Sequence, residues 1–297
     1  MLPLFLTSIL GLLGCADEAA EALLTCEGGN IEACYNEGMA AVQPPRPNFG
    51  DARQAFSKAC MTHHAPSCYQ LARLVRDAKG GPKDLVRAVD LYGIACEKWS
   101  EPEACVDLGF ALYDGAGTKE DPERAVQLLK KACNLEEPIW RACSRLADAF
   151  SEGKGVEKKN EEKAEELYNK SCDAGFADAC VAAGKRHQER KRKNDLKAAA
   201  TFFGKGCDID ARKGCFELAQ MHTNKRWNEA KVDLASEYFQ KTCSIDPTRG
   251  CFEAAQLMEE GKVDAREGEI EYLYNLACEH GHTEACTKRQ LDLGSDR

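Results

Sequence analysis

The sequence predicts an all-α fold: a right-handed αα-superhelical solenoid of stacked helical hairpins, stapled by disulfides. Two observations lead to this prediction. Sixteen of the 17 cysteines fall into eight pairs, whose members lie eight, nine or ten residues apart. The first members of successive pairs follow at intervals of 34 to 39 residues, and a period in this range is typical of stacked supersecondary units. The pairs are Cys26 and Cys34, Cys60 and Cys68, Cys96 and Cys105, Cys133 and Cys143, Cys172 and Cys180, Cys207 and Cys215, Cys243 and Cys251, and Cys278 and Cys286.

The segment before each first cysteine is predicted to be an amphipathic helix, termed helix B. Positions −8, −4 and 0 relative to that cysteine share one face of an α-helix, so the cysteine belongs to the buried stripe. Six consecutive repeats have alanine at −8: Ala52, Ala88, Ala125, Ala164, Ala199 and Ala235. Seven have a large apolar or aromatic residue at −4: Phe56, Tyr92, Leu129, Tyr168, Phe203, Phe239 and Tyr274.

The segment after each second cysteine is predicted to be the partner helix, termed helix A. The residue four positions after the second cysteine is small, which lets helix B approach closely. Glycine inside a helix costs about 1 kcal/mol relative to alanine, so the glycines at this position need a packing reason. Glycines in residues 115–117 and 153–155 are expected to end helix A by adopting positive φ. The small residues are Gly38, Ala72, Gly109, Ala147, Gly184, Ala219 and Ala255.

Each cysteine pair therefore connects the end of one helix B with the start of the next helix A. Regularly spaced cysteines in even number favour a disulfide framework in an exported chain. Each disulfide would close a short loop and stabilise its joint by roughly 2–3 kcal/mol. The alternative is that all sixteen cysteines are reduced and act as small core residues.

The N-terminus is expected to direct export. Residues 1–14 carry no charge, are too short to span a bilayer and suit the apolar region of a secretion signal. Residues 12–15, Leu-Leu-Gly-Cys, resemble the bacterial lipobox, in which the cysteine is lipidated, and Cys15 has no partner at the repeat spacing. We therefore predict a lipoprotein signal peptide at 1–14 and a solenoid of about seven to eight repeats at 15–297. The alternative makes Leu4 to Leu13 part of a buried first helix.

Composition limits the class of partner. The chain has 49 acidic and 40 basic side chains, a net charge of −9, which argues against a general nucleic-acid binder. We expect contact with a membrane only through the lipid, and no cofactor. The expected location is the bacterial cell envelope, as a periplasmic or surface lipoprotein.

The stretch from Cys105 to Gly117 reads Cys-x-x-Leu-Gly-x-x-x-Tyr-x-Gly-x-Gly. It is similar to the Sel-one-like repeat, a tetratricopeptide-like αα-hairpin, and the two cysteines at each joint resemble the Helicobacter cysteine-rich protein subfamily. The resemblance covers about residues 16–292. It implies an exported, disulfide-stapled scaffold that binds a protein or peptide. The alternative that it implies is a penicillin-binding protein with weak β-lactamase activity.

Two motifs could indicate catalysis or metal binding, but neither function is predicted. Ser151 and Lys154 have the Ser-x-x-Lys spacing of serine β-lactamases, but the Ser-Asp-Asn and Lys-Thr-Gly elements are missing from the sequence. The repeat itself explains the lysine and the glycine beside it. His63 and His64 lie between Cys60 and Cys68, which gives four possible zinc ligands, but pairs without histidine have the same spacing.

Two surface features allow a binding interpretation or a purely structural one. The basic run 185–193 is placed in a turn between helices A and B, where it either docks an anionic partner or is solvated. Aromatic residues one position after the second cysteine either contact a peptide on the concave surface or fill space between hairpins. These residues are Tyr35, Tyr69, Phe216 and Phe252.

Overall fold

The computed structural model of the protein describes residues 25–98, 100–190, 193–210, 212–224, 227 and 229–288. The predicted signal peptide and Cys15 lie outside these residues, so lipidation and the boundary at residue 15 stay predictions. Over the described ranges the regular structure is entirely helical. None of the described helices combines the length and the apolar character that a membrane crossing requires.

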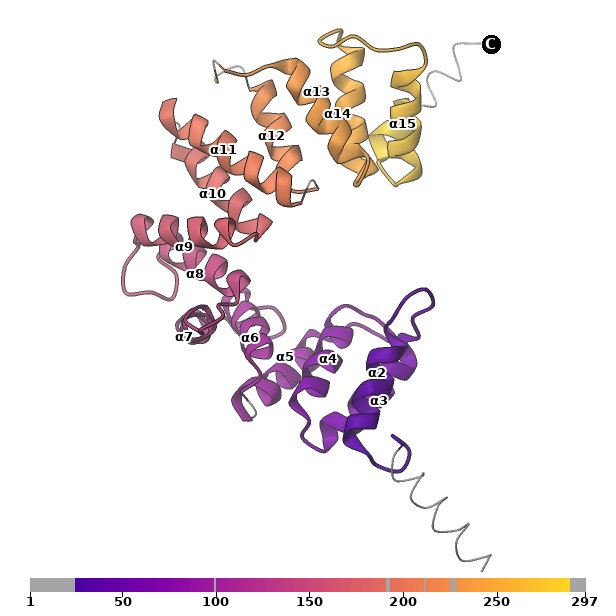
Figure 1. Ribbon diagram of the computed structural model, residues 1–297, viewed down its shortest axis with the longest axis vertical. Helices are drawn as coiled ribbons and strands as arrows, with labels where there is room; N and C mark the ends of the chain where they lie inside the picture. Colours follow the sequence, from indigo (N-terminus) through magenta and orange to yellow (C-terminus); the bar gives the residue numbers. More distant parts are fainter. Residues whose placement is uncertain are drawn as a thin grey trace, which may run out of the picture. The chain divides into compact units, whose positions relative to one another are not determined.

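Helices A and B alternate along the chain, which confirms the predicted all-α solenoid of hairpins (Figure 1). The helices A are α2 (Ile31–Ala41), α4 (Ala65–Arg76), α6 (Pro102–Asp114), α8 (Trp140–Glu152), α10 (Ala177–Arg190), α12 (Gly214–Thr223) and α14 (Pro247–Glu259). The helices B are α3 (Phe49–Met61), α5 (Leu85–Gly93) continued by the π-helical turn η1 (Ile94–Lys98), α7 (Pro122–Cys133), α9 (Glu161–Asp173), α11 (Lys193–Ile209), α13 (Val232–Cys243) and α15 (Glu269–Glu279).

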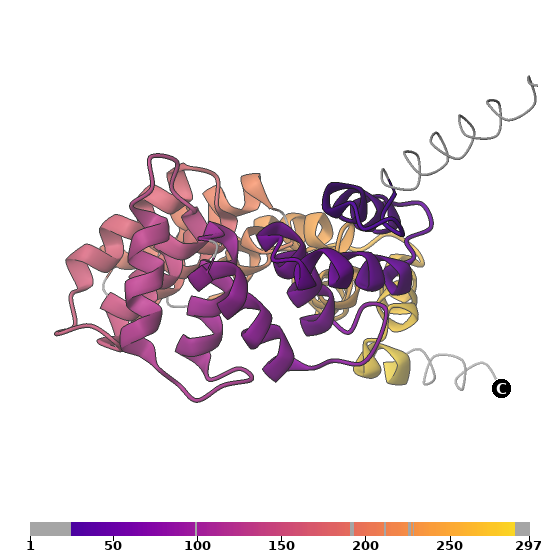
Figure 2. The same ribbon diagram turned by 90° about the horizontal axis from the view of Figure 1, so that it is seen from below.

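The chain divides into two compact units, and the division falls inside α8. Unit 1 contains the residues up to Arg145 together with Glu152–Lys159. Unit 2 contains Leu146–Ser151 and the residues from Asn160 onward. From α2 to α7 in unit 1 and from α9 to α15 in unit 2, helices that follow one another in sequence also pack against one another. Figure 2 shows these hairpins from a second direction.

The predicted stripe of helix B forms the core of each hairpin. All six alanines at −8 are at most 1% exposed, and all seven large residues at −4 are at most 2% exposed. Burial of these apolar side chains is the main favourable contribution to the stability of the array. The stripe therefore lies where the sequence pattern placed it.

The small position of helix A has the packing role that the sequence predicted. A Cβ atom added at Gly38 would lie 2.5 Å from the ring of Phe56, and one added at Gly184 would lie 2.5 Å from the ring of Phe203. Both rings occupy position −4 of the helix B in the same hairpin. The glycines thus make room for a buried ring, which offsets their cost to helix stability.

Side-chain caps and two turn glycines fix where helices B begin and how hairpins stack. Asp121 caps α7 by accepting a 3.0 Å hydrogen bond from the backbone N–H of Arg124. Gly117 and Gly155 have positive φ, and a Cβ atom on them would lie within 2.4 Å of a backbone carbonyl oxygen at Leu85 or Pro122. These glycines therefore allow each turn to touch the start of the preceding helix B.

Disulfide bonds are present at all eight joints, and each one lies within the pair that the spacing predicted. In each pair the two Cα atoms lie between 4.3 and 4.9 Å apart, a separation suited to a disulfide. Most of these bonds connect the last turn of a helix B with the first turn of the next helix A. The staples are thus local, and each belongs to a single joint. The bonds join Cys26 with Cys34, Cys60 with Cys68, Cys96 with Cys105, Cys133 with Cys143, Cys172 with Cys180, Cys207 with Cys215, Cys243 with Cys251, and Cys278 with Cys286.

The fully reduced alternative, in which the cysteines act only as small core residues, is therefore not what the structure shows. The sulfurs are nevertheless part of the core as well. Cys34 is 2% exposed, and Cys180, Cys215 and Cys251 are 0% exposed. At the last joint Cys286 is only partly buried. The second cysteine of a pair thus both closes its joint and fills space at the start of a helix A.

Residues 185–190 of the basic run 185–193 are helical and do not form the turn that we expected. Helix α10 continues through it to Arg190, and α11 begins at Lys193. The helical path brings basic side chains to carboxylates on neighbouring helices. Arg190 lies 3.0 Å from Glu165 on α9, and Lys185 lies 2.8 Å from Glu217 on α12.

Candidate protein-binding face

The four aromatic residues predicted for binding all contact the large residue at −4 of their own hairpin. Phe216 packs on Phe239 with ring centroids 5.4 Å apart. Phe252 packs in the same way on Tyr274, at 5.8 Å. Phe216 and Phe252 are buried, so these two rings fill space inside the hairpins and are not presented to a ligand.

Tyr35 and Tyr69 remain partly exposed. The ring of Tyr69 lies 6.1 Å from that of Tyr92, and the guanidinium of Arg73 lies 5.7 Å from its centroid. Burial and then the charge of Asp107 raise the pKa of Tyr69 to about 12. At neutral pH its phenol is therefore protonated and available as a hydrogen-bond donor.

A buried carboxylate organises the surface next to Tyr69. Asp107 lies on α6, two residues after Cys105, and its side chain is 5% exposed. Arg76 on α4 reaches one carboxylate oxygen at 3.5 Å, and Arg141 on α8 binds the other. Because the charge is buried and paired on both sides, it links three consecutive helices A.

Arg141 connects this network to a second carboxylate and to a ring. Its guanidinium also binds Glu103 and lies 5.5 Å from the ring of Phe110. Burial alone would lower the pKa of Arg141, but Asp107 and Glu103 raise it above its usual value. The guanidinium is therefore charged and held in place from several directions.

We call this surface of unit 1 the arginine face. It combines planar guanidinium groups with aromatic rings, the residue types that dominate binding energy at protein interfaces. Its members are Tyr69, Arg73, Arg76, Glu103, Asp107, Phe110 and Arg141. Sequence reasoning missed all of them except Tyr69. For Glu103, Asp107 and Arg141 the available signal was a charge two residues before or after the second cysteine.

The Ser-x-x-Lys motif does not form an accessible site. Ser151 is 1% exposed, and its buried hydroxyl has no hydrogen-bond partner among the described residues. Lys154 donates a 2.7 Å hydrogen bond to the carbonyl oxygen of Tyr113 and lies 3.1 Å from Glu120. A buried serine at this position cannot reach a β-lactam carbonyl.

The histidines near the second joint have structural surroundings as well. Cys60 and Cys68 are joined in a disulfide, which removes both sulfurs as metal ligands. The Nδ1 atom of His64 lies 2.8 Å from the hydroxyl of Ser67, and its ring packs on Tyr35 at 5.1 Å. Within the described ranges, no group of three His, Cys, Asp or Glu side chains is arranged to hold a metal ion.

Comparisons with known proteins agree with the repeat pattern. The model of the Sel1 repeat family matches residues 65–98, 102–136 and 140–176, each of which spans one helix A and one helix B. Cytochrome c oxidase assembly factor 7 of Xenopus tropicalis is 26% identical over 173 residues, which cover 56% of this chain and 74% of that protein.

Solved structures show the same fold. A Sel1 repeat protein from Oxalobacter formigenes matches 78% of this chain and 94% of its own, with a TM-score of 0.64 and 18% identity. A protective antigen of uropathogenic Escherichia coli with an SLR fold matches 90% of this chain with a TM-score of 0.62 and 21% identity. This chain covers only 57% of that antigen. The cysteine rich protein B of Helicobacter pylori is 27% identical over 47% of this chain and 98% of its own, but the TM-score of 0.33 adds nothing to the fold argument.

Proposed function

We propose that this chain, which carries Sel1 repeats, is a scaffold that binds a protein partner through the arginine face of unit 1. One observation supports this proposal above the others. The buried carboxylate of Asp107 pairs with both Arg76 and Arg141, which lie beside partly exposed aromatic rings. Asp77 also binds Arg76, at 2.7 Å, and Glu103 also binds Arg141, so both guanidinium groups are held from more than one side. A surface that is ordered before binding loses less side-chain entropy when the partner arrives.

The class of function agrees with the repeat type. Tetratricopeptide-like and Sel1 repeats generally mediate protein interactions, and the Xenopus relative is named an assembly factor. For this chain we adopt only the general role of holding another protein. The motif considered for a β-lactamase gives no comparable support, because Ser151 is buried.

The proposed location is the bacterial envelope, with a lipid anchor on Cys15. Eight disulfides favour an oxidising compartment, since thiols stay reduced in the cytosol. A Cys15→Ser variant should lose lipid labelling and leave the membrane fraction. Unchanged labelling and fractionation in that variant would refute the anchor.

Site-specific photocrosslinking in native cells tests the arginine face. A benzophenone amino acid replaces Arg73, which lies beside Tyr69 and belongs to the face. The control places it at Glu166, an exposed position on a helix B of unit 2. We expect a discrete protein adduct from position 73 and at least about tenfold less from position 166, since contacts in the centre of an interface dominate binding. Identical adduct patterns at both positions, or none at 73, would refute the proposal.

A further inference from the structure

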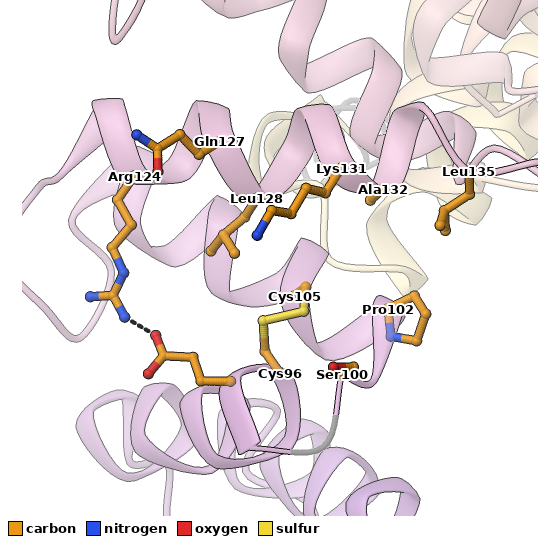
Figure 3. A pocket seen from close by; sticks show the side chains of 11 residues that line it. Cys96, Ser100, Pro102, Cys105, Arg124, Gln127, Leu128, Lys131, Ala132 and Leu135 are labelled. Carbon is orange, nitrogen blue, oxygen red and sulfur yellow. Dashed lines mark hydrogen bonds and ion pairs between the residues drawn. A yellow bond between two sulfur atoms is a disulfide. The ribbon is translucent and has the colours of Figure 1, made fainter.

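A groove of about 470 Å³ lies in unit 1 between α7 and the joint that connects η1 with α6 (Figure 3). The disulfide between Cys96 and Cys105 forms part of its floor. Helix α7 supplies the opposite wall through Gln127, Leu128 and Lys131. This groove is separate from the arginine face, because none of the residues that line it belongs to that face.

Three departures from the regular repeat coincide at this groove. The cysteines of the joint are nine residues apart, whereas six of the other pairs are eight apart. Helix α5 changes into the π-helical turn Ile94–Lys98, and Ser100 adopts a φ of 55°. Turns of the π type occur frequently at functional sites, and unusual backbone conformations cluster there as well.

The groove has an apolar part and one unbalanced positive charge. Leu128 and Leu135 line it, and Leu135 is 41% exposed, which is high for a leucine. Glu97 and Arg124 pair with each other, so their charges cancel. The ammonium of Lys131 has no carboxylate partner in the part of the chain that the structure describes, and Figure 3 shows it pointing into the space above the disulfide.

The dimensions fit a short stretch of extended chain. The wall from Arg124 to Lys131 is two helical turns long, or about 10 Å, which matches about three residues of an extended peptide. The volume falls in the range of established ligand sites. Both Gln127 and Lys131 are exposed, so the groove is open along α7.

We propose that this groove binds a partner peptide in which an aliphatic residue stands next to an aspartate or glutamate. The aliphatic side chain packs on Leu128 and Leu135 and is removed from water there. The carboxylate binds the ammonium of Lys131, and the side-chain amide of Gln127 can donate a further hydrogen bond. This site is independent of the arginine face and does not rest on it.

Methyl NMR of the full chain with short peptides tests the proposal. The probes are acetyl-Gly-Leu-Asp-Gly-amide and acetyl-Gly-Asp-Leu-Gly-amide, each compared with its Asn counterpart. At least one Asp peptide should shift the methyl signals of Leu128 and Leu135. It should saturate at a concentration about fivefold lower than the Asn peptide, the size expected of one partly exposed charge pair.

Two variants on the same helix separate the groove from general charge attraction. Lys131→Gln should remove the preference for Asp over Asn. Lys130→Gln removes the same charge one residue away, but Lys130 does not line the groove. This variant should therefore retain the preference. The proposal is wrong if no Asp peptide shifts the two leucines, or if both variants lose the preference equally.

A third variant distinguishes peptide binding in the groove from peptide binding at the arginine face. Arg73→Glu alters the arginine face and should leave the shifts of Leu128 and Leu135 unchanged. Loss of these shifts in Arg73→Glu would assign the peptide to the arginine face and overturn the groove as a binding site.

Discussion

Unit 1 and unit 2 place an acidic residue at the same position of the repeat, two residues after the second cysteine, with different results. In unit 1 Asp107 is buried and contacts Arg76 and Arg141. In unit 2 Glu253 has no ion pair among the described residues, and burial raises its pKa although the charge of Arg249 opposes the shift. One carboxylate is the centre of a network, and the other is a partly desolvated acid.

Neighbouring positions of the repeat explain this difference. The partner that the next repeat offers to Asp107 is Arg141, two residues before Cys143. In the repeat that follows Glu253, the residue two positions before the second cysteine is Glu284, whose negative charge raises the pKa of Glu253 further. Arg249 occupies the same position in the repeat of Glu253 itself, but its guanidinium stacks 3.9 Å above the ring of Phe216. A charge at one position of the repeat therefore acquires its role from the hairpins on either side.

Two joints of unit 2 differ from the joints of unit 1 as well. Directly before the second cysteine, unit 1 has the fully buried alanines Ala104 and Ala142, and unit 2 has Ala179 and Ala285 in two of its joints. The other two joints of unit 2 have Gly214 and Gly250 at this position. A Cβ atom on Gly250 would lie 2.3 Å from the backbone nitrogen of Cys243. The two chain segments at this joint are therefore closer than an alanine permits.

The largest expected effect distinguishes the two carboxylates. Asp107→Ala should lower the free energy of unfolding by about 3 kcal/mol, because it leaves Arg76 and the partly buried Arg141 without the buried carboxylate that they share. Urea unfolding at pH 7 measures this loss. Asp114 lies on α6, as Asp107 does, and is an exposed partner of Arg145. The control Asp114→Ala should therefore cost less than about 1 kcal/mol. Equal losses in the two variants would show that Asp107 is not the centre of a network.

A smaller effect is expected at the joints. Gly250→Ala should destabilise the protein by about 2 kcal/mol, because the added methyl group meets backbone atoms that cannot rotate away. The opposite change in unit 1, Ala142→Gly, should cost only about 1 kcal/mol through lower helix propensity. Thermal unfolding monitored by circular dichroism compares them. If Gly250→Ala were as stable as the parent, the glycine joint would not be closer than an alanine joint.

The smallest expected effect is a pH-dependent difference in stability between the parent and Glu253→Gln. The pKa of Glu253 is raised above its ordinary value of 4.5, so the folded protein binds this proton more tightly than the unfolded chain does. The resulting stabilisation is complete below pH 4.5 and is lost as the pH rises through the folded-state pKa. Glu253→Gln should therefore be slightly more stable than the parent at pH 7, by at most about 1 kcal/mol. The difference should vanish at pH 4, and a variant less stable at pH 7 would contradict this account.

The sequence pattern was sufficient to predict the hairpin but not the surfaces that hairpins create together. The stripe and the small position repeat within one hairpin, so contacts such as that between Gly38 and Phe56 follow from helical periodicity. The pairing of Asp107 with Arg141 depends on the register between hairpins, which periodicity does not specify. The groove depends on the turn at Ile94–Lys98, for which the only sequence signal was a spacing of nine. The basic run extends α10 because carboxylates on other helices pair with it.

The short reach of the disulfides has a consequence for how such a chain matures and evolves. The two members of each pair are separated by eight to ten residues, and no pair encloses another. In an oxidising environment each joint can therefore form its bond independently of the others, because the partner of the first cysteine of each pair is the next cysteine in the sequence. A repeat of one helix A and one helix B, such as 65–98, contains the second cysteine of one bond and the first cysteine of the next. Its loss by recombination therefore leaves one first and one second cysteine, which meet at a new joint and can pair there. The number of repeats can thus change from one descendant to the next while every joint keeps two cysteines.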